Sequence, residues 1–202
     1  MSEFQAYLTL GFDHITDPNG YDHILFVVAL CAIYAFREWR KVLVLVTAFT
    51  LGHSVTLALS TLKIITYSSA VIELLIPITI LITALSNFSE NNTANSKSPK
   101  LRYLLAASFG LIHGMGFSNY LRSLLGEQES IVLPLFSFNL GLELGQLVIV
   151  TIALAIASFF VEVLKIKRLT WNHLISGMVA GMALSLILSN SLFRSLVGMS
   201  VE

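Results

Sequence analysis

The sequence predicts an all-α fold, a polytopic transmembrane helical bundle of about six spans. Composition is the first reason, because 55% of the 202 residues are hydrophobic and only 12% are charged. A soluble domain carries about 25% charged residues, so this chain has too little polar surface to cover a globule in water. The second reason is that the apolar residues gather in long runs, of roughly the 17–25 residues that cross the hydrocarbon core of a bilayer.

The apolar runs predict one transmembrane domain over residues 1–202. They lie at residues 21–36, 42–62, 68–88, 101–125, 132–161 and 172–193. The first run is short for a span, and the fifth is long enough to tilt. No cleavable signal peptide is visible, so the first run is expected to serve as its own insertion signal. Residues 1–20 are expected to be an extracytoplasmic segment, and the Asn/Ser-rich stretch 89–100 a polar cytoplasmic loop.

The basic residues predict the orientation of the bundle. Most of the 12 Lys and Arg residues follow the first, third or fifth run, as Arg37, Arg40, Lys41, Lys97, Lys100, Arg102, Lys165, Lys167 and Arg168. The positive-inside rule puts these connections in the cytoplasm. Both termini are then extracytoplasmic, in a bacterial-type inner membrane.

Charge and cysteine content exclude several function classes. Net charge is zero and no basic block could follow a phosphate backbone, so no nucleic-acid partner is expected. Cys31 is the only cysteine, which excludes an intramolecular disulfide framework and a thiolate-rich zinc site. Small residues at spacing four are expected to pack within the lipid-embedded bundle, with a homo-oligomer as the alternative; they are Gly141, Gly145, Gly177, Gly181, Ser185 and Ser189.

Ionisable side chains interrupt the apolar runs. Each costs at least about 2.5–3.5 kcal/mol at mid-membrane, so such residues usually face a cavity, pair with each other or carry function. The candidate metal ligands are His14, Asp22, His23, His53, Glu73, His113 and Glu143, with Thr50, Asn139 and Gln146 as supporting polar groups. Imidazole and carboxylate together suit borderline divalent ions, so a divalent transition metal such as Ni²⁺, Co²⁺, Zn²⁺ or Fe²⁺ is expected.

The depth of these residues predicts a funnel. With the termini outside, His23 and Glu73 lie near the outer surface, whereas His53 and His113 lie near mid-depth. Asn139, Glu143 and Gln146 repeat at i, i+4 and i+7, which places them on one face of the fifth run. The sequence therefore predicts a metal site that opens to the extracytoplasmic side.

Four segments carry a resemblance to a known family: HITDPNGYDHILF (14–26), FTLGHSVTL (49–57), FGLIHGMGF (109–117) and FNLGLELGQ (138–146). In these segments, and in the same order over most of the chain, the sequence resembles the HupE/UreJ family of small integral membrane proteins, regarded as nickel permeases or nickel-supply proteins. The resemblance implies that His23, His53, Glu73 and His113 occupy the family's polar motif positions. The opening is also similar to the His-x4-Asp-His signature of a larger nickel/cobalt transporter family, although His14 and Asp22 are further apart here.

A metal-ion permease is the leading hypothesis, and no enzyme is expected. Metal would enter past Asp22 and His23, bind deeper and leave inward. An intramembrane metal-dependent enzyme, such as a zinc hydrolase or protease, is one alternative, because a catalytic zinc takes three His or Glu ligands and a water. The chain has no HExxH motif, and Ser118 is followed by Asn119 rather than Gly. A metal-binding accessory or sensor protein is the other alternative.

Overall fold

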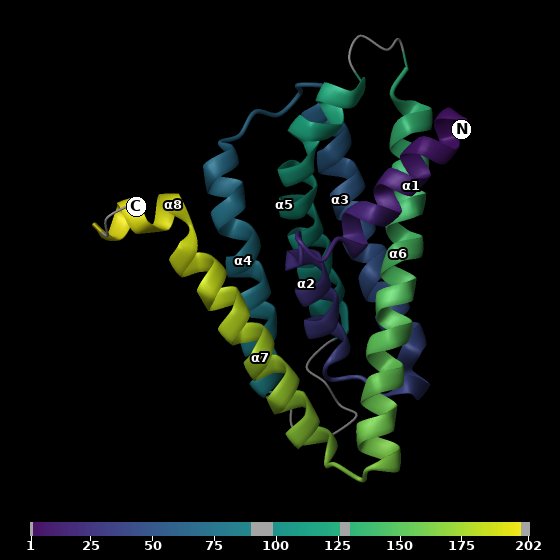
Figure 1. Cartoon of the computed structure of the whole chain (residues 1–202), viewed down its shortest axis with the longest axis vertical. Helices are drawn as coiled ribbons and strands as arrows, with labels where there is room; N and C mark the ends of the chain where they lie inside the picture. Colours follow the sequence, from purple (N-terminus) through teal and green to yellow (C-terminus); the bar gives the residue numbers. More distant parts are fainter. Residues whose placement is uncertain (1, 90–98, 126–129, 199–202) are drawn as a thin grey trace.

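The computed structural model describes residues 2–89, 99–125 and 130–198, and all regular structure in these ranges is helical. Figure 1 shows the bundle. The α-helices are α1 (Glu3–Thr16), α2 (Asp22–Cys31), α3 (Trp39–Thr61), α4 (Ser69–Ser86), α5 (Pro99–Leu125), α6 (Val132–Ser158), α7 (Arg168–Ser189) and α8 (Ser191–Val197). Short helical turns, η1 (Phe36–Glu38), η2 (Asn87–Ser89) and η3 (Phe159–Val163), extend α3, α4 and α6. The predicted all-α fold is confirmed, and the predicted loop 89–100 lies mostly outside the described residues.

The number of membrane crossings is confirmed only in part. The stretches long and apolar enough to cross a membrane are Phe36–Thr61, Ser69–Ser89, Val132–Val163 and Arg168–Ser189. Helix α5 has 27 residues, but it is not among them, since a histidine, several glycines and polar residues lower its hydropathy. Helix α2 has 10 residues, so at 1.5 Å per residue it is about 15 Å long, too short to cross alone. The chain is an integral membrane protein, and six crossings remain a prediction.

The amino-terminal segment is a helix rather than an extended stretch. Ser2 accepts a hydrogen bond from the Gln5 backbone N–H, and the Gln5 side chain accepts one from the Ser2 N–H, so a capping box starts α1. Helix α1 lies along the first half of α6 at very short range (Figure 1). A Cβ on Gly11 would lie 1.9 Å from the carbonyl oxygen of Phe138, and a Cβ on Gly141 would lie 1.9 Å from that of Leu8. Only glycine permits this approach.

Helices α1 and α2 follow one another along the same neighbour. Val27 and Cys31 of α2 pack in one apolar cluster with Val150 and Leu154, from the second half of α6. The residues between the two helices include Asp17, whose carboxylate accepts a hydrogen bond from the Asn19 N–H at 2.8 Å and turns the chain. Together, α1 and α2 form an interrupted helical path with a break beside the middle of α6.

Helices α3 and α5 form a second close pair. A Cβ on Gly110 would lie 2.1 Å from the carbonyl oxygen of Phe49, and a Cβ on Gly114 would lie 2.2 Å from that of His53. Glycines on either side of His113 thus let α3 approach α5 closely. This contact fixes the relative height of His53 and His113 on the two helices.

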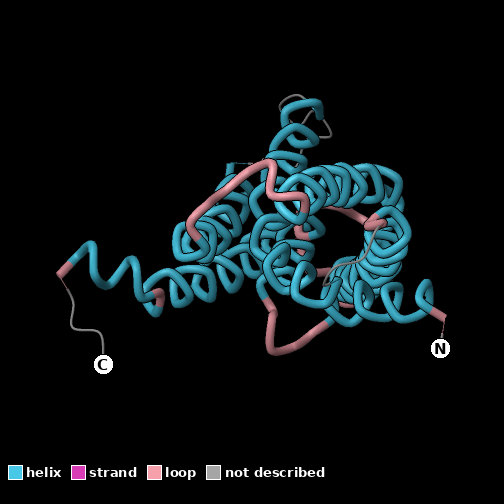
Figure 2. The backbone as a smooth tube through the Cα atoms, turned by 90° about the horizontal axis from the view of Figure 1, so that it is seen from above, coloured by secondary structure: helices cyan, strands magenta, loops and turns pink. Residues whose placement is uncertain are grey.

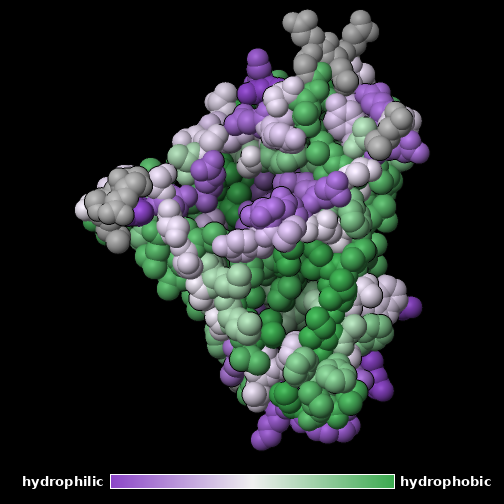
Figure 3. Space-filling view, in the orientation of Figure 1, coloured by the Kyte–Doolittle hydropathy of each residue, from purple (hydrophilic) through white to green (hydrophobic). Residues whose placement is uncertain are grey.

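Polarity is distributed along the bundle as a membrane protein requires. Figure 3 shows a hydrophobic band over the middle and lower surface, with hydrophilic groups at the lower tip and around a hollow in the upper half. The connections α2–α3 and α6–α7 both lie at the lower end in Figure 1, and basic residues gather in them and at the helix starts that follow, as Arg37, Arg40, Lys41, Lys165, Lys167 and Arg168. Figure 2 shows that α8 projects away from the bundle.

Candidate metal centre

Three histidines from three different helices meet inside the bundle. His14 on α1, His23 on α2 and His53 on α3 each offer a ring nitrogen within 4.8 Å of the other two. Two nitrogens bound to one zinc-sized ion, at about 2.1 Å each, are at most about 4.2 Å apart. Small side-chain rotations would therefore bring all three nitrogens onto one ion.

His113 on α5 extends this group to four imidazoles. Its ring centroid lies 5.2 Å from that of His23, while the His14 and His23 centroids are 4.6 Å apart. His23 therefore stands between the outer His14 and the buried His113. His53 and His113 are 0% and 1% exposed, so water has no direct access to either ring. We refer to His14, His23, His53 and His113 as the imidazole cluster.

Hydrogen bonds orient two rings of the cluster. The Nδ1 atom of His23 lies 3.1 Å from Oδ1 of Asp22, and Nδ1 of His113 lies 2.9 Å from the carbonyl oxygen of Phe109. A proton held on Nδ1 by an oxygen acceptor leaves the Nε2 lone pair for a metal.

Ring nitrogens without a hydrogen-bond partner are the strongest sign that the imidazole cluster binds an ion. The buried ring nitrogens that have no hydrogen-bond partner are Nε2 of His14, His23 and His113, and both nitrogens of His53. Buried polar atoms are normally paired, since an unpaired one costs about 1–3 kcal/mol. Neutral imidazole nitrogens without a proton donor are the ligands that divalent transition metals take, so these residues fit such an ion.

Aromatic side chains wall the cluster. The Phe117 ring lies 4.0 Å from the His14 ring, centroid to centroid. Phe138 stacks on His53 at 6.3 Å, and Phe49 lies 5.2 Å from His113. These rings exclude water and hold the imidazoles in place, which strengthens electrostatic interactions in the site.

Two open cavities lie beside the break between α1 and α2, and one of them reaches the imidazole cluster at His14. The first, of about 550 Å³, is lined by His14 together with Asp13, Asp17 and Tyr120. His14 belongs both to the imidazole cluster and to the lining of this cavity, so an ion in the cavity can reach its ring.

The second cavity, of about 370 Å³, is lined by both Asp22 and Glu73, with Asn190 beside them. The Asp22 carboxylate lines this cavity while it accepts hydrogen bonds from the backbone N–H and the ring of His23.

Of the predicted acids, Asp22 contacts the imidazole cluster through His23, whereas Glu73 and Glu143 lie apart from it. Glu73 is exposed and shares its cavity with Asp22 rather than with His53. Glu143 accepts a hydrogen bond of 2.8 Å from the Thr47 hydroxyl, and the set of ligand atoms within 4.8 Å of one another does not include its carboxylate.

The predicted supporting groups lie on the boundary between α3 and α6. Thr50 donates to Oε1 of Gln146 at 2.7 Å. The Asn139 amide donates to the Leu135 carbonyl oxygen at 2.7 Å, and the Asn139 side chain also lies against His53. These groups continue from His53 along one side of the bundle.

Sequence reasoning missed the helix that carries His14 and two residues beside the site. The Ser2–Gln5 capping box was the available signal for α1. Phe117 carried no such signal, because an aromatic residue is ordinary in a membrane helix, whereas the spacing of three that places Thr47, Thr50 and His53 on one helix face was a signal for Thr47.

Fold and site together define an integral membrane protein with a buried imidazole cluster that opens towards one end of the bundle. The family model described as HupE / UreJ protein matches residues 1–192. The chain therefore belongs to the HupE/UreJ family, which relates it to nickel or cobalt transport across membranes. Comparisons with curated proteins and with solved structures found no significant match.

Proposed function

We propose that this protein is a permease for a divalent transition-metal ion, most suitably Ni²⁺. One observation carries the proposal: His14, His23 and His53 bring ring nitrogens within 4.8 Å of one another, and these nitrogens include unpartnered ones. Family membership supports it. His14 also lines an open cavity, so an ion has a route to the ligands.

Charge and helix ends favour entry of a cation. Asp13 and Asp17 line the first cavity and raise the local concentration of cations. His14 lies in the last turn of α1, where the partial negative charge of the helix carboxyl end favours a bound cation. Interrupted helices with their ends at mid-membrane are a recurring way of building ion sites in transporters.

The ligand set selects the class of ion. Neutral imidazoles suit nickel, cobalt, zinc and iron, whereas Mg²⁺ and Ca²⁺ prefer an all-oxygen shell. Cys31, the only thiol, is buried and packs with Val27 and Val150, so softer thiolate chemistry plays no part. Water molecules leave the ion as the imidazoles replace them in the aromatic-walled site.

The proposed topology has both termini on the extracytoplasmic side of a bacterial-type inner membrane. In it, α1 and α2 together count as one interrupted crossing, and α5 is a further crossing. The basic residues after α2, before α5 and after α6 support this orientation. The imidazole cluster then opens outward.

Uptake by the purified protein tests the proposal. Proteoliposomes that hold a metal-sensitive dye should take up Ni²⁺, and His53→Gln should lower the initial rate by about tenfold or more, since it removes a buried ligand. The matched control is His173→Gln, on α7 beside Phe88, which should transport as the wild type does. Equal rates for wild type and His53→Gln would contradict the proposal.

A metal-dependent enzyme is the second candidate, because three imidazoles beside an open cavity also suit a catalytic zinc that keeps one position for water. A metal-dependent turnover of a peptide or lipid without flux would favour it. Stoichiometric binding without flux or turnover would favour an accessory or sensor role.

A further inference from the structure

The imidazole cluster holds no negative charge of its own, so an ion that leaves it needs another partner deeper in the bundle. The nearest carboxylate along the α3–α6 boundary is Glu143, which follows Asn139 by one helical turn. From these residues and their partners we infer that Glu143, Thr47, Thr50 and Gln146 form a second cation site, an oxygen-ligand release site that receives the ion after the imidazoles. This inference rests on the proposed transport function.

The release site has the atoms that such an ion needs. Thr47 donates to Oε1 of Glu143 at 2.8 Å, and Thr50 donates to Oε1 of Gln146 at 2.7 Å. Hydroxyl, amide and carboxylate oxygens thus gather from two helices, with one formal negative charge among them. Such oxygens bind a divalent transition metal more weakly than imidazoles do, which suits release.

Unpartnered atoms point into this boundary. Gln146 is 0% exposed, yet its Nε2 has no acceptor. A partly hydrated cation would bring water oxygens that accept from this amide. Asn139 is held through Nδ2 by the Leu135 carbonyl, and its buried side chain also lies against His53. Asn139 therefore lies between the imidazole cluster and the release site.

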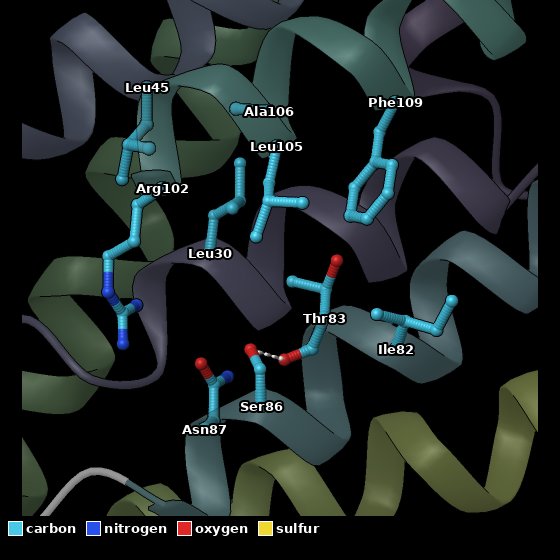
Figure 4. A pocket seen from close by; sticks show the side chains of 10 residues that line it. All are labelled: Leu30, Leu45, Ile82, Thr83, Ser86, Asn87, Arg102, Leu105, Ala106 and Phe109. Carbon is cyan, nitrogen blue, oxygen red and sulfur yellow. Dashed lines mark hydrogen bonds between the residues drawn. The ribbon is translucent and has the colours of Figure 1, made fainter. Parts of the chain in front are cut away.

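The other way out of the cluster is closed by aromatic rings. Phe26 lies 4.9 Å from Phe49 and 6.0 Å from Phe109, centroid to centroid, and Phe26 lies 5.5 Å from His113. Beyond Phe109 is a mostly apolar pocket that Figure 4 shows with Arg102 at its far end. A guanidinium repels a cation, so this pocket does not suit the exit of a metal ion.

An apolar layer separates the release site from the lower end of the bundle. Val42, Val46, Val150 and Leu154 pack together there, and each is at most 6% exposed. The structure is therefore open at the imidazole cluster and closed below Glu143, as expected for a carrier that has yet to open inward. Separation of α3 from α6 at this layer would release the ion.

Glu143→Gln tests the inference, with Glu162→Gln on the exposed η3 turn as the matched control. The full chain is used, for Ni²⁺ affinity in detergent and for Ni²⁺ entry into proteoliposomes. Glu143→Gln should keep the affinity of the imidazole cluster within about twofold and lower entry by about tenfold. Glu143→Asp, which keeps the charge, should recover most of the rate, and Glu162→Gln should behave as wild type.

Each other outcome overturns the inference. Wild-type entry in Glu143→Gln would show that no release site depends on this carboxylate. Loss of Ni²⁺ affinity in that variant, in protein that still unfolds cooperatively, would make Glu143 part of the first site. A wild-type chain that binds Ni²⁺ at His53 without moving it would overturn the transport function itself, and the release site with it.

Discussion

The carboxylate of Asp22 accepts a hydrogen bond from its neighbour, His23, whose Nδ1 lies 3.1 Å from Oδ1 of Asp22. The Asp22 carboxylate also accepts from the backbone N–H of His23 at 2.9 Å. One acid therefore fixes both the start of α2 and the orientation of an imidazole that touches His14 and His113. A carboxylate that accepts a hydrogen bond from the second ring nitrogen sets both the tautomer and the basicity of a metal-binding histidine.

Replacement of Asp22 by Asn should weaken Ni²⁺ binding by about 10–100-fold, because the His23 ring loses its charged acceptor. Competition with a chelating dye in detergent measures the affinity. Asp13→Asn removes the same charge from the exposed rim of the first cavity and should change the affinity little at physiological salt, where exposed charges are screened. Similar losses in both variants would mean that only the summed charge matters.

Gly114→Ala should destabilise the protein by about 1–3 kcal/mol or more, since overpacking forces helices apart. The added Cβ would lie 2.2 Å from the carbonyl oxygen of His53, at the height where α3 and α5 present their histidines. Gly181→Ala on α7 is the matched control, because a Cβ there meets no atom within 4 Å. Thermal unfolding in detergent compares the two, and an equal effect would contradict the close α3–α5 contact.

Gly141→Ala should reproduce the loss of Ni²⁺ affinity that His14→Gln causes. Its Cβ would lie 1.9 Å from the Leu8 carbonyl oxygen, so α1 must move and take His14 with it. If both changes act through His14, the double variant should bind no worse than either single variant. Losses that simply add would show that α1 does more than position this ring.

Helix content and the identity of the central histidines could be predicted from the sequence, because both depend on local pattern. A run of apolar residues must be helical in lipid, and His53 and His113 stand out in the middle of such runs. Which helices touch is a different matter. In lipid, apolar faces are alike, and close packing depends on small residues such as Gly11 and Gly110, whose partners cannot be told from spacing.

The predicted ligand set mixed groups that the fold separates. The sequence indicates how deep His53 and Glu143 lie along their helices. It does not indicate in which direction around the helix axis each side chain points relative to its neighbours. Thr47 holds Glu143, and the cavity with Asp22 holds Glu73. His14 is a predicted metal ligand in a segment expected outside the membrane, and helix α1 brings it to His23 and His53 inside the bundle. The residues between His14 and Asp22 include the turn that joins α1 to α2, and this turn brings His14 near Asp22 and His23.

Two of the four imidazoles come from the first two helices, and the other two come from the pair α3 and α5. His14 and His23 belong to the first two helices, whereas His53 and His113 are set by the glycine contacts of α3 with α5. Newly inserted protein can form the latter pair while its beginning is still undocked, and an ion that engages both pairs would cross-link them and favour the assembled state. The concentration of the transported ion would then affect the fraction of newly made protein that reaches the assembled fold.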